Sequence, residues 1–215
     1  MKTFKNYLLT GGLLCVALAL PCRSAAAPGQ TSHFKFAGLT ASAFFDSFDP
    51  TGCVETLASV FAISDRTQTM GRPEATPTAF VSLFQADNCT FTLLVSAFGS
   101  ADLSAATFQI KQNLDSATLN TSIDVFDFVS GTTFPVDISL SWTGTGGLTV
   151  SKFHNITRMP GLQENSTFTG TSRPATASGS MTALGTNFAP NPAVFPAAEL
   201  DSVKTGDVTI THPSH

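Results

Sequence analysis

The chain has 215 residues, with 11 basic and 15 acidic side chains and a formal net charge of −4. Charged residues make up 12% of it, about half of the roughly 25% that is typical of soluble proteins. This acidic, sparsely charged composition contains no basic patch of the kind that binds a phosphate backbone, which argues against nucleic acid as a partner.

The N-terminus has the three-part layout of a secretory signal peptide. Lys2 and Lys5 give a positive start, an apolar run follows from Tyr7 to Leu20, and small residues precede a cut that we place near Ala26. We therefore predict a signal peptide over residues 1–26 and a single all-β domain over 27–215. The mature chain keeps 8 of the 11 basic residues and all 15 acidic ones, a formal charge of −7.

Two other fates of the N-terminus are open. A retained anchor is disfavoured because the apolar run is shorter than the ~20 residues that span a bilayer. Lipidation at Cys22 is disfavoured because Pro21 fits a lipoprotein cleavage site poorly. Export predicts a secreted, periplasmic or cell-surface location, with no transmembrane segment in the mature chain.

Two stretches 36 residues apart resemble each other: Phe48–Leu57 and Phe84–Leu93. In each, an apolar run reaches a turn, the turn ends at a cysteine, and a second apolar run follows. We predict two β-hairpins with Cys53 and Cys89 at equivalent places. Since they are the only cysteines after removal of the leader, and export favours disulfides, we expect them to be bonded. A metal-bound or redox-active pair is disfavoured, because no C-x-x-C spacing and no nearby histidine accompanies them, and no cofactor is expected.

The clearest strand is Phe134–Trp142, where apolar residues alternate strictly with Pro, Asp and Ser. It predicts a strand with one face in the core, and Trp142 belongs to that inward face. Glycine-containing turns separate it from Ser116–Phe128 and Leu148–Ile156, which predicts a three-stranded antiparallel meander.

The strands of the twin hairpins differ, since they carry apolar residues on both faces. Val60 and Ala62 lie on one face of the second strand, and Leu57 and Phe61 lie on the other. This pattern predicts strands covered on both sides, by a second sheet with a loop or by another subunit, so a homo-oligomer is possible.

The remaining segments are assigned by composition. Residues 64–77, 159–165 and 185–196 are predicted loops, Thr167–Met181 one or two strands, and Asp207–Thr211 a final strand, while Ala197–Val203 could form a helical turn. About ten strands with short connections predict an antiparallel β-sandwich or flattened barrel, of which we prefer the sandwich.

No nucleophile elbow, phosphate loop or zinc motif occurs. Three polar residues are candidates for binding a ligand: Arg173, Glu55 and His154. Arg173 stands among small residues and could bind an anion, or pair with Glu55 or Asp46. His154 is the one histidine within a predicted strand. The alternative for Arg173 and His154 is an ordinary surface or structural role.

Five aspartates cluster near the predicted turns: Asp46, Asp49, Asp87, Asp124 and Asp127. Carboxylates gathered at one end of a fold can bind calcium, but their spacing matches no known calcium loop. Aspartate also forms turns by hydrogen bonding to its own backbone, and we favour that interpretation.

Two functions follow from these features. The first is a non-enzymatic secreted or surface domain that is structural or binds an unknown protein or surface partner. The second is an enzyme or small-ligand carrier with a cavity inside a barrel. The second requires Arg173, Glu55 and His154 to converge on a closed pocket, whereas the first predicts that they are scattered.

Overall fold

The computed structural model describes residues 31–69, 72–74, 77–104, 106–159, 162–191 and 198–211. Regular structure in these ranges is β-strand throughout, and no helix occurs among them, so the predicted all-β class is confirmed. The strands are β1 (Thr31–Phe48), β2 (Val54–Thr69), β3 (Arg72–Glu74), β4 (Thr78–Asp87), β5 (Thr92–Asp102), β6 (Phe108–Ile110), β7 (Ser116–Asp127), β8 (Thr132–Gly144), β9 (Thr149–Met159), β10 (Leu162–Ala183), β11 (Thr186–Phe188) and β12 (Ala198–Thr211). The predicted leader lies outside the described residues.

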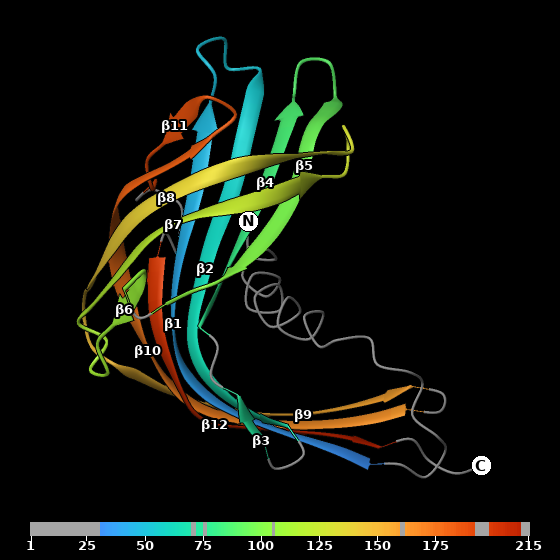
Figure 1. Ribbon diagram of the computed structural model, residues 1–215, viewed down its shortest axis with the longest axis vertical. Coiled ribbons are helices and arrows are strands. Elements are labelled where there is room, and N and C mark those ends of the chain that lie inside the picture. The colour runs from blue at the N-terminus through green and yellow to red at the C-terminus, as the bar shows by residue number, and fades with distance from the viewer. Residues whose placement is uncertain are drawn as a thin grey trace.

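One antiparallel sheet contains these strands and closes on itself (Figure 1). From β1 the ladder passes through β2, β4, β5, β7, β8, β10 and β12, and β12 pairs with β1 again. Neighbours in the ring follow each other in the chain, which is the up-and-down arrangement that β-hairpins produce. The closed ladder corresponds to the flattened barrel rather than to the two separate sheets of a sandwich.

The weakest junction of the ring lies between β5 and β7. Two residue pairs join these strands, Ala97–Asp127 and Phe98–Phe126. Gly99 follows directly in β5, and a Cβ atom on it would lie 2.3 Å from the carbonyl oxygen of Asp124. The missing side chain at Gly99 therefore lets the two strands approach closely enough for the barrel to close.

Alternation along the strands separates an apolar interior from the outer surface. In β8 the buried residues are Val136, Ile138, Leu140 and Trp142, and the three residues between them are exposed, as predicted. Trp142 also links two walls of the barrel, because its indole Nε1–H donates to the carbonyl oxygen of Ser42 in β1 over 2.7 Å.

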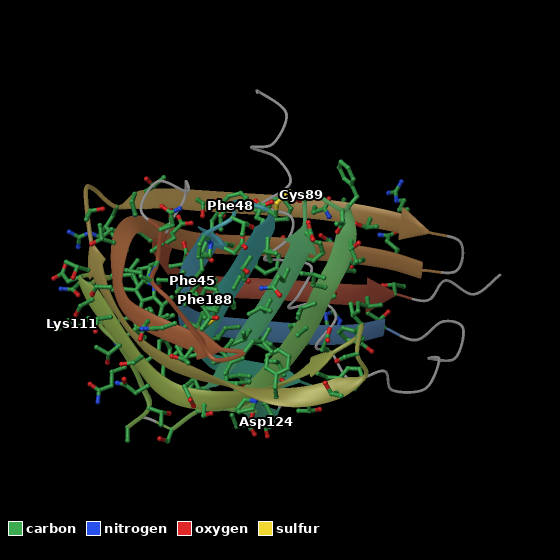
Figure 2. The ribbon with its side chains drawn as sticks, turned by 90° about the horizontal axis from the view of Figure 1, so that it is seen from above. Phe45, Phe48, Cys89, Lys111, Asp124 and Phe188 are labelled. Atoms are coloured by element: carbon green, nitrogen blue, oxygen red, sulfur yellow. A yellow bond between two sulfur atoms is a disulfide. The ribbon has the colours of Figure 1, made fainter. Side chains whose placement is uncertain are left out.

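Small side chains line much of the opposite wall. The buried alanines of β1, β2 and β4 are Ala41, Ala43, Ala58, Ala62 and Ala79. They allow the walls to come together, and larger side chains such as Phe45 and Phe188 fill the remaining interior (Figure 2). The interior is thus a packed apolar core.

Beyond the barrel the sheet continues into a curved extension that we call the flange. It consists of the outer ends of β2, β1, β12 and β10, with β3 along one edge and β9 along the other. In Figure 1 the flange runs to the lower right. The loops predicted over 64–77 and 159–165 are wrong in part, because β2 continues to Thr69 and β10 begins at Leu162. Backbone pairing with neighbouring strands, rather than an apolar pattern, makes these polar segments strands.

The predicted hairpin between β8 and β9 is also wrong. Both strands pair antiparallel with β10, β8 with its C-terminal half and β9 with its N-terminal half. The segment Gly144–Gly147 is therefore a kink between two successive strands. The N–H of Thr145 donates to the carbonyl oxygen of Pro174 over 2.6 Å and holds the chain against β10. Gly144 allows a close approach, since a Cβ there would lie 2.3 Å from the Leu114 carbonyl oxygen.

The C-terminal third contains longer strands than predicted. Thr167–Met181 lies within the single strand β10, and Asp207–Thr211 is the end of β12. The described part of Ala197–Val203 is the start of β12 rather than a helical turn, because it pairs with both β1 and β10. β11 occupies the beginning of the loop predicted over 185–196.

Candidate functional site

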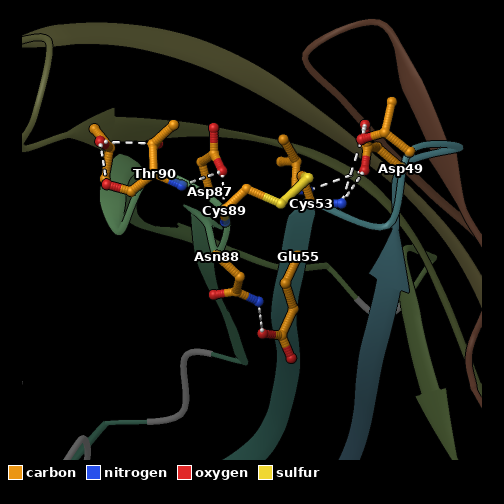
Figure 3. Close-up of a disulfide and its surroundings, with 10 residues drawn as sticks. Asp49, Cys53, Glu55, Asp87, Asn88, Cys89 and Thr90 are labelled. Atoms are coloured by element: carbon orange, nitrogen blue, oxygen red, sulfur yellow. Dashed lines mark hydrogen bonds between the residues drawn. A yellow bond between two sulfur atoms is a disulfide. The ribbon is translucent and has the colours of Figure 1, made fainter.

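The twin hairpins lie side by side, as predicted, and a disulfide joins them (Figure 3). Cys53 follows the β1–β2 turn and Cys89 lies in the β4–β5 turn, with their Cα atoms 5.3 Å apart. The backbone N–H of Asn88 also donates to the carbonyl oxygen of Cys53 over 2.8 Å. We call this end of the barrel the cysteine rim, formed by the turns 49–53, 88–91 and 128–131.

An aspartate organises the first turn of the cysteine rim. Asp49 Oδ1 accepts hydrogen bonds from the backbone N–H groups of Cys53 (3.0 Å) and Val54 (2.9 Å), and the Thr51 hydroxyl donates to Oδ2 over 2.7 Å. These bonds favour the charged carboxylate, and that from Thr51 contributes most to lowering the pKa of Asp49. The interpretation of Asp49 as a turn-former is supported.

The second and third turns share one construction. Asp87 pairs with Thr92 across a four-residue turn, and Asp127 pairs with Thr132 across another. Asp87 Oδ1 accepts from the backbone N–H groups of residues 89 and 90, and Asp127 accepts from those of residues 129 and 130. In each turn the hydroxyl of the third residue, Thr90 or Ser130, lies within hydrogen-bond distance of the closing threonine.

Asp127 has the most extensive set of contacts among these aspartates. The Ser130 hydroxyl donates to it over 2.6 Å, and the N–H of Ser96 in β5 donates over 3.0 Å. Together with the N–H groups of Val129 and Ser130, they lower the pKa of Asp127 to about 2, with the Ser130 hydroxyl contributing most. Since Ser96 belongs to β5, this carboxylate also strengthens the weak β5–β7 junction. The pKa of Asp87 is lowered mainly by the Thr90 N–H.

The fourth residue of these two turns differs. Gly131 has φ of +70° and Phe91 has φ of +56°, so both adopt the left-handed conformation. Glycine reaches it freely, whereas a bulky side chain there costs of the order of 1 kcal/mol. Phe91 is also 93% exposed, so its side chain regains none of that cost by burial. The sequence indicates this relationship through the repeated pattern Asp-x-x-(Thr/Ser)-x-Thr, which is distinct from the cysteine repeat.

An apolar surface continues from the cysteine rim down the outside of the barrel. We call it the aromatic face; its residues are Leu57 and Phe61 of β2, Phe80 and Phe84 of β4, Leu93 and Phe98 of β5, and Phe126 of β7. Cross-strand pairs connect it, namely Leu57–Phe84, Phe61–Phe80 and Phe98–Phe126. The rings of Phe80 and Phe98 stack with centroids 6.2 Å apart.

The aromatic face corrects one expectation about the twin hairpins. No second sheet or loop of the described chain covers the outward face, since Leu57, Phe84, Leu93, Phe98 and Phe126 are each 39–44% exposed, and covering by another subunit stays a prediction. Within the described part of the chain, only the inward face is buried. The outward positions between the apolar residues are serines, such as Ser59 and Ser82, whose hydroxyls lie 2.8 Å apart.

Arg173 lies at the other end of the barrel, in β10. It forms an ion pair with Asp115 in the turn before β7, rather than with Glu55 or Asp46. Gly144 leaves room for it, since a Cβ there would lie 2.9 Å from Cδ and Nε of Arg173. Its Nε is buried without a hydrogen-bond partner. The ion pair joins the β6–β7 turn to β10.

The other two candidate residues lie elsewhere. Glu55 begins β2, and its Oε2 accepts a hydrogen bond from Asn88 Nδ2 over 2.9 Å beside the disulfide (Figure 3). His154 is exposed in β9 of the flange, with Nδ1 3.0 Å from the Thr167 hydroxyl. Each of the three candidates thus has its own partner on a different pair of elements. The sulfurs of Cys53 and Cys89 and a carboxylate oxygen of Asp87 lie within 4.8 Å of one another, but disulfide sulfurs offer no thiolate to a metal.

Comparisons with known proteins add no function. No protein-family model and no curated protein matches the chain. A solved structure of a proposed AttH protein from Nitrosomonas europaea is similar over 91% of this chain, with 14% identity and a TM-score of 0.31. The chain spans 57% of that protein's length. Among the described residues, no helix has the length and apolar character needed to cross a membrane.

Proposed function

We propose that this protein is an exported, disulfide-stabilised all-β domain that binds another protein through its aromatic face. The observation that carries the proposal is the continuous exposed apolar surface across β2, β4, β5 and β7. Large contiguous apolar patches on a protein surface commonly mark interaction sites. A structural role for the domain is compatible with this proposal, because a structural protein also contacts neighbouring molecules.

The chemistry of the aromatic face favours a protein partner. Its outward positions in β2 from Leu57 to Ile63, in β4 from Phe80 to Phe84, and in β5 from Leu94 to Ser100 hold only apolar residues and serine. A surface without cations cannot attract phosphate groups, of nucleic acid or of anionic lipid. Aromatic side chains with adjacent hydroxyl groups provide instead the apolar anchors and hydrogen bonds of protein interfaces.

The alternative, a ligand-binding or catalytic barrel, finds less support. It requires polar groups that converge inside the barrel, but Arg173, Glu55 and His154 contact different elements. The inward positions hold a packed apolar core that includes Trp142. We therefore propose binding rather than catalysis.

A cross-linking experiment tests the proposal. A photoreactive residue replaces Ser82, which lies between Phe80 and Phe84, and the protein is illuminated in its native envelope or secreted fraction. The cross-linked protein is then purified and its Kd for the wild-type domain is measured. We expect Phe84→Ser with Phe98→Ser to weaken binding at least about 30-fold, because aromatic anchors contribute roughly 1–2 kcal/mol or more each.

The matched control is Ser139→Ala, an exposed change on the outward face of β8, which should leave the Kd unchanged. Equal Kd values for the wild type and the Phe84/Phe98 double variant would refute the aromatic face as the site. So would efficient cross-linking from position 139 together with none from position 82.

A further inference from the structure

β9 forms one edge of the flange and pairs on one side. Its residues from Thr149 to Met159 all pair with β10, and no other described residue pairs with them. Figure 2 shows β9 as the outermost strand of the flange. Alternate backbone N–H and C=O groups of β9 therefore point away from β10, where they bond to water or pair with another extended strand.

The side chains of this edge are exposed and partly apolar. Val150 is 68% exposed, and Phe153 and Ile156 are each 46% exposed. Natural edge strands are usually short or shielded, because a long exposed edge pairs with other chains. The β9 edge has eleven residues and carries two cations, Lys152 near its middle and Arg158 near its end. The edge thus has the features of a strand that pairs with another strand.

The sequence of β9 is complementary to itself in one register. Two antiparallel copies related by a two-fold axis through Phe153 place each Val150 opposite the partner's Ile156, and Phe153 opposite the partner's Phe153. In the same register Lys152 lies opposite the partner's His154. Apolar side chains then meet apolar ones on both faces of the sheet, and cross-strand pairs of this kind stabilise a β-ladder.

The neighbouring registers are less favourable. An axis through Lys152 places that lysine opposite its own copy. An axis through His154 places Val150 opposite the partner's Arg158 and Ile156 opposite the partner's Lys152. An axis through Asn155 places Lys152 opposite the partner's Arg158. Since like charges and mismatched pairs destabilise a ladder, the register centred on Phe153 is preferred.

We infer that β9 is a dimerisation edge, through which two copies of this chain join their flanges into one continuous antiparallel sheet centred on Phe153. The flange extends away from the barrel, so a second copy can approach this edge (Figure 1). The interface is separate from the aromatic face, and either can exist without the other.

Sedimentation velocity over a concentration series tests the inference. We expect the wild type to form a dimer that dissociates on dilution, and Val150→Lys alone to raise the dissociation constant at least tenfold. Val150→Lys combined with Ile156→Glu should restore the dimer, because each introduced cation then faces an introduced carboxylate. The matched control is Val129→Glu, which removes an exposed apolar side chain in the β7–β8 turn and should leave the dimer intact.

Cross-linking identifies the register. Phe153→Cys should give a disulfide-linked dimer on mild oxidation, because opposite residues of an antiparallel pair have Cα atoms about 4.5–5.5 Å apart, within disulfide range. Asn155→Cys should not, since it faces the partner's Ser151. A protein that is monomeric at every concentration, a dimer unaffected by Val150→Lys, or cross-linking at position 155 and not at 153 would each overturn the inference.

Discussion

Phe91 and Gly131 occupy the same position in two turns of the same construction, and both have a positive φ. The aspartate that begins each turn, the serine or threonine hydroxyl and the closing threonine correspond. Glycine is the residue that this conformation favours, and phenylalanine is not. The β4–β5 turn therefore keeps a strained, exposed aromatic side chain at a position where the β7–β8 turn shows that glycine is sufficient.

This difference predicts opposite effects of two substitutions. Phe91→Gly should stabilise the fold, because it removes about 1 kcal/mol of backbone strain and loses no buried area. The greater entropy that glycine gives the unfolded chain offsets part of this gain. Gly131→Phe should destabilise the fold by the same net amount, because phenylalanine adds the backbone strain and removes the extra chain entropy of glycine. Urea unfolding followed by the fluorescence of Trp142, the sole tryptophan and 1% exposed, measures both. A clear loss of stability in Phe91→Gly would show that the phenyl ring stabilises the fold itself.

The disulfide predicts a large effect on stability. Cys53→Ser with Cys89→Ser opens a covalent loop that spans 36 residues in sequence separation, which costs about 4 kcal/mol in the chain-entropy model. Thermal unfolding should show a substantially lower Tm for the double variant. Mass spectrometry of the native protein should detect no free thiol at Cys53 or Cys89, and two free thiols would contradict the pairing directly.

The close approach of β5 and β7 leads us to expect that alanine substitutions at Gly99 and Gly147 have different effects on stability. Gly99→Ala should destabilise the protein by roughly 1–3 kcal/mol, because the new Cβ would lie 2.3 Å from the Asp124 carbonyl oxygen and the strands must separate. Gly147→Ala is the control, since no atom lies within 4 Å of its Cβ position. Hydrogen exchange of the β5 and β7 amides measures the opening, and equal protection in both variants would show that the junction tolerates the methyl group.

We expect Asp127 to make the folded protein less stable in acid. Its pKa is lowered to about 2 in the folded state, so the folded state binds fewer protons than the unfolded chain between about pH 4 and 2. Its contribution is present above pH 4 and disappears as the pH falls through that window. Asp127→Asn should lower the Tm at pH 7 and flatten the acid dependence. An unaltered dependence on pH between 4 and 2 would assign the acid sensitivity to other carboxylates.

For Asp201 we expect the opposite dependence of folding stability on pH. Burial in β12 raises the pKa of Asp201 to about 7, the nearby Glu199 adds to the shift, and a hydrogen bond from Thr40 opposes it. The folded state therefore binds more protons than the unfolded chain between about pH 4 and 7, and stability decreases as the pH rises through this window. The free energy of unfolding should fall by only about 3 kcal/mol across this window, because solvent partly screens the buried charge.

Asp201→Asn keeps the neutral form and should remove this decrease. The variant should unfold at higher urea concentration than the wild type at pH 8, and at nearly the same concentration at pH 4. A variant less stable than the wild type at pH 8 would mean that the charged carboxylate has a favourable partner in the fold.

Elements with a local cause could be predicted from the residues alone. The alternation from Phe134 to Trp142 determined a half-buried strand, because side chains of a strand alternate between faces with a period of two. The repeated turns predicted the twin hairpins, and the equivalent places of Cys53 and Cys89 in them predicted the disulfide. Aspartates at turns were predictable too, since Asp87 and Asp127 bond to backbone N–H groups two and three residues away.

The identity of neighbouring strands and the faces that are covered could not be predicted in this way. Gly144–Gly147 has the composition of a hairpin turn, yet β9 continues past β8 because β10 is long enough to pair with both. The apolar outward residues of β2, β4 and β5 resemble a second core face, but the sheet closes into a barrel and leaves them exposed. Pairing and burial depend on contacts between residues far apart in the chain, which a local pattern does not encode.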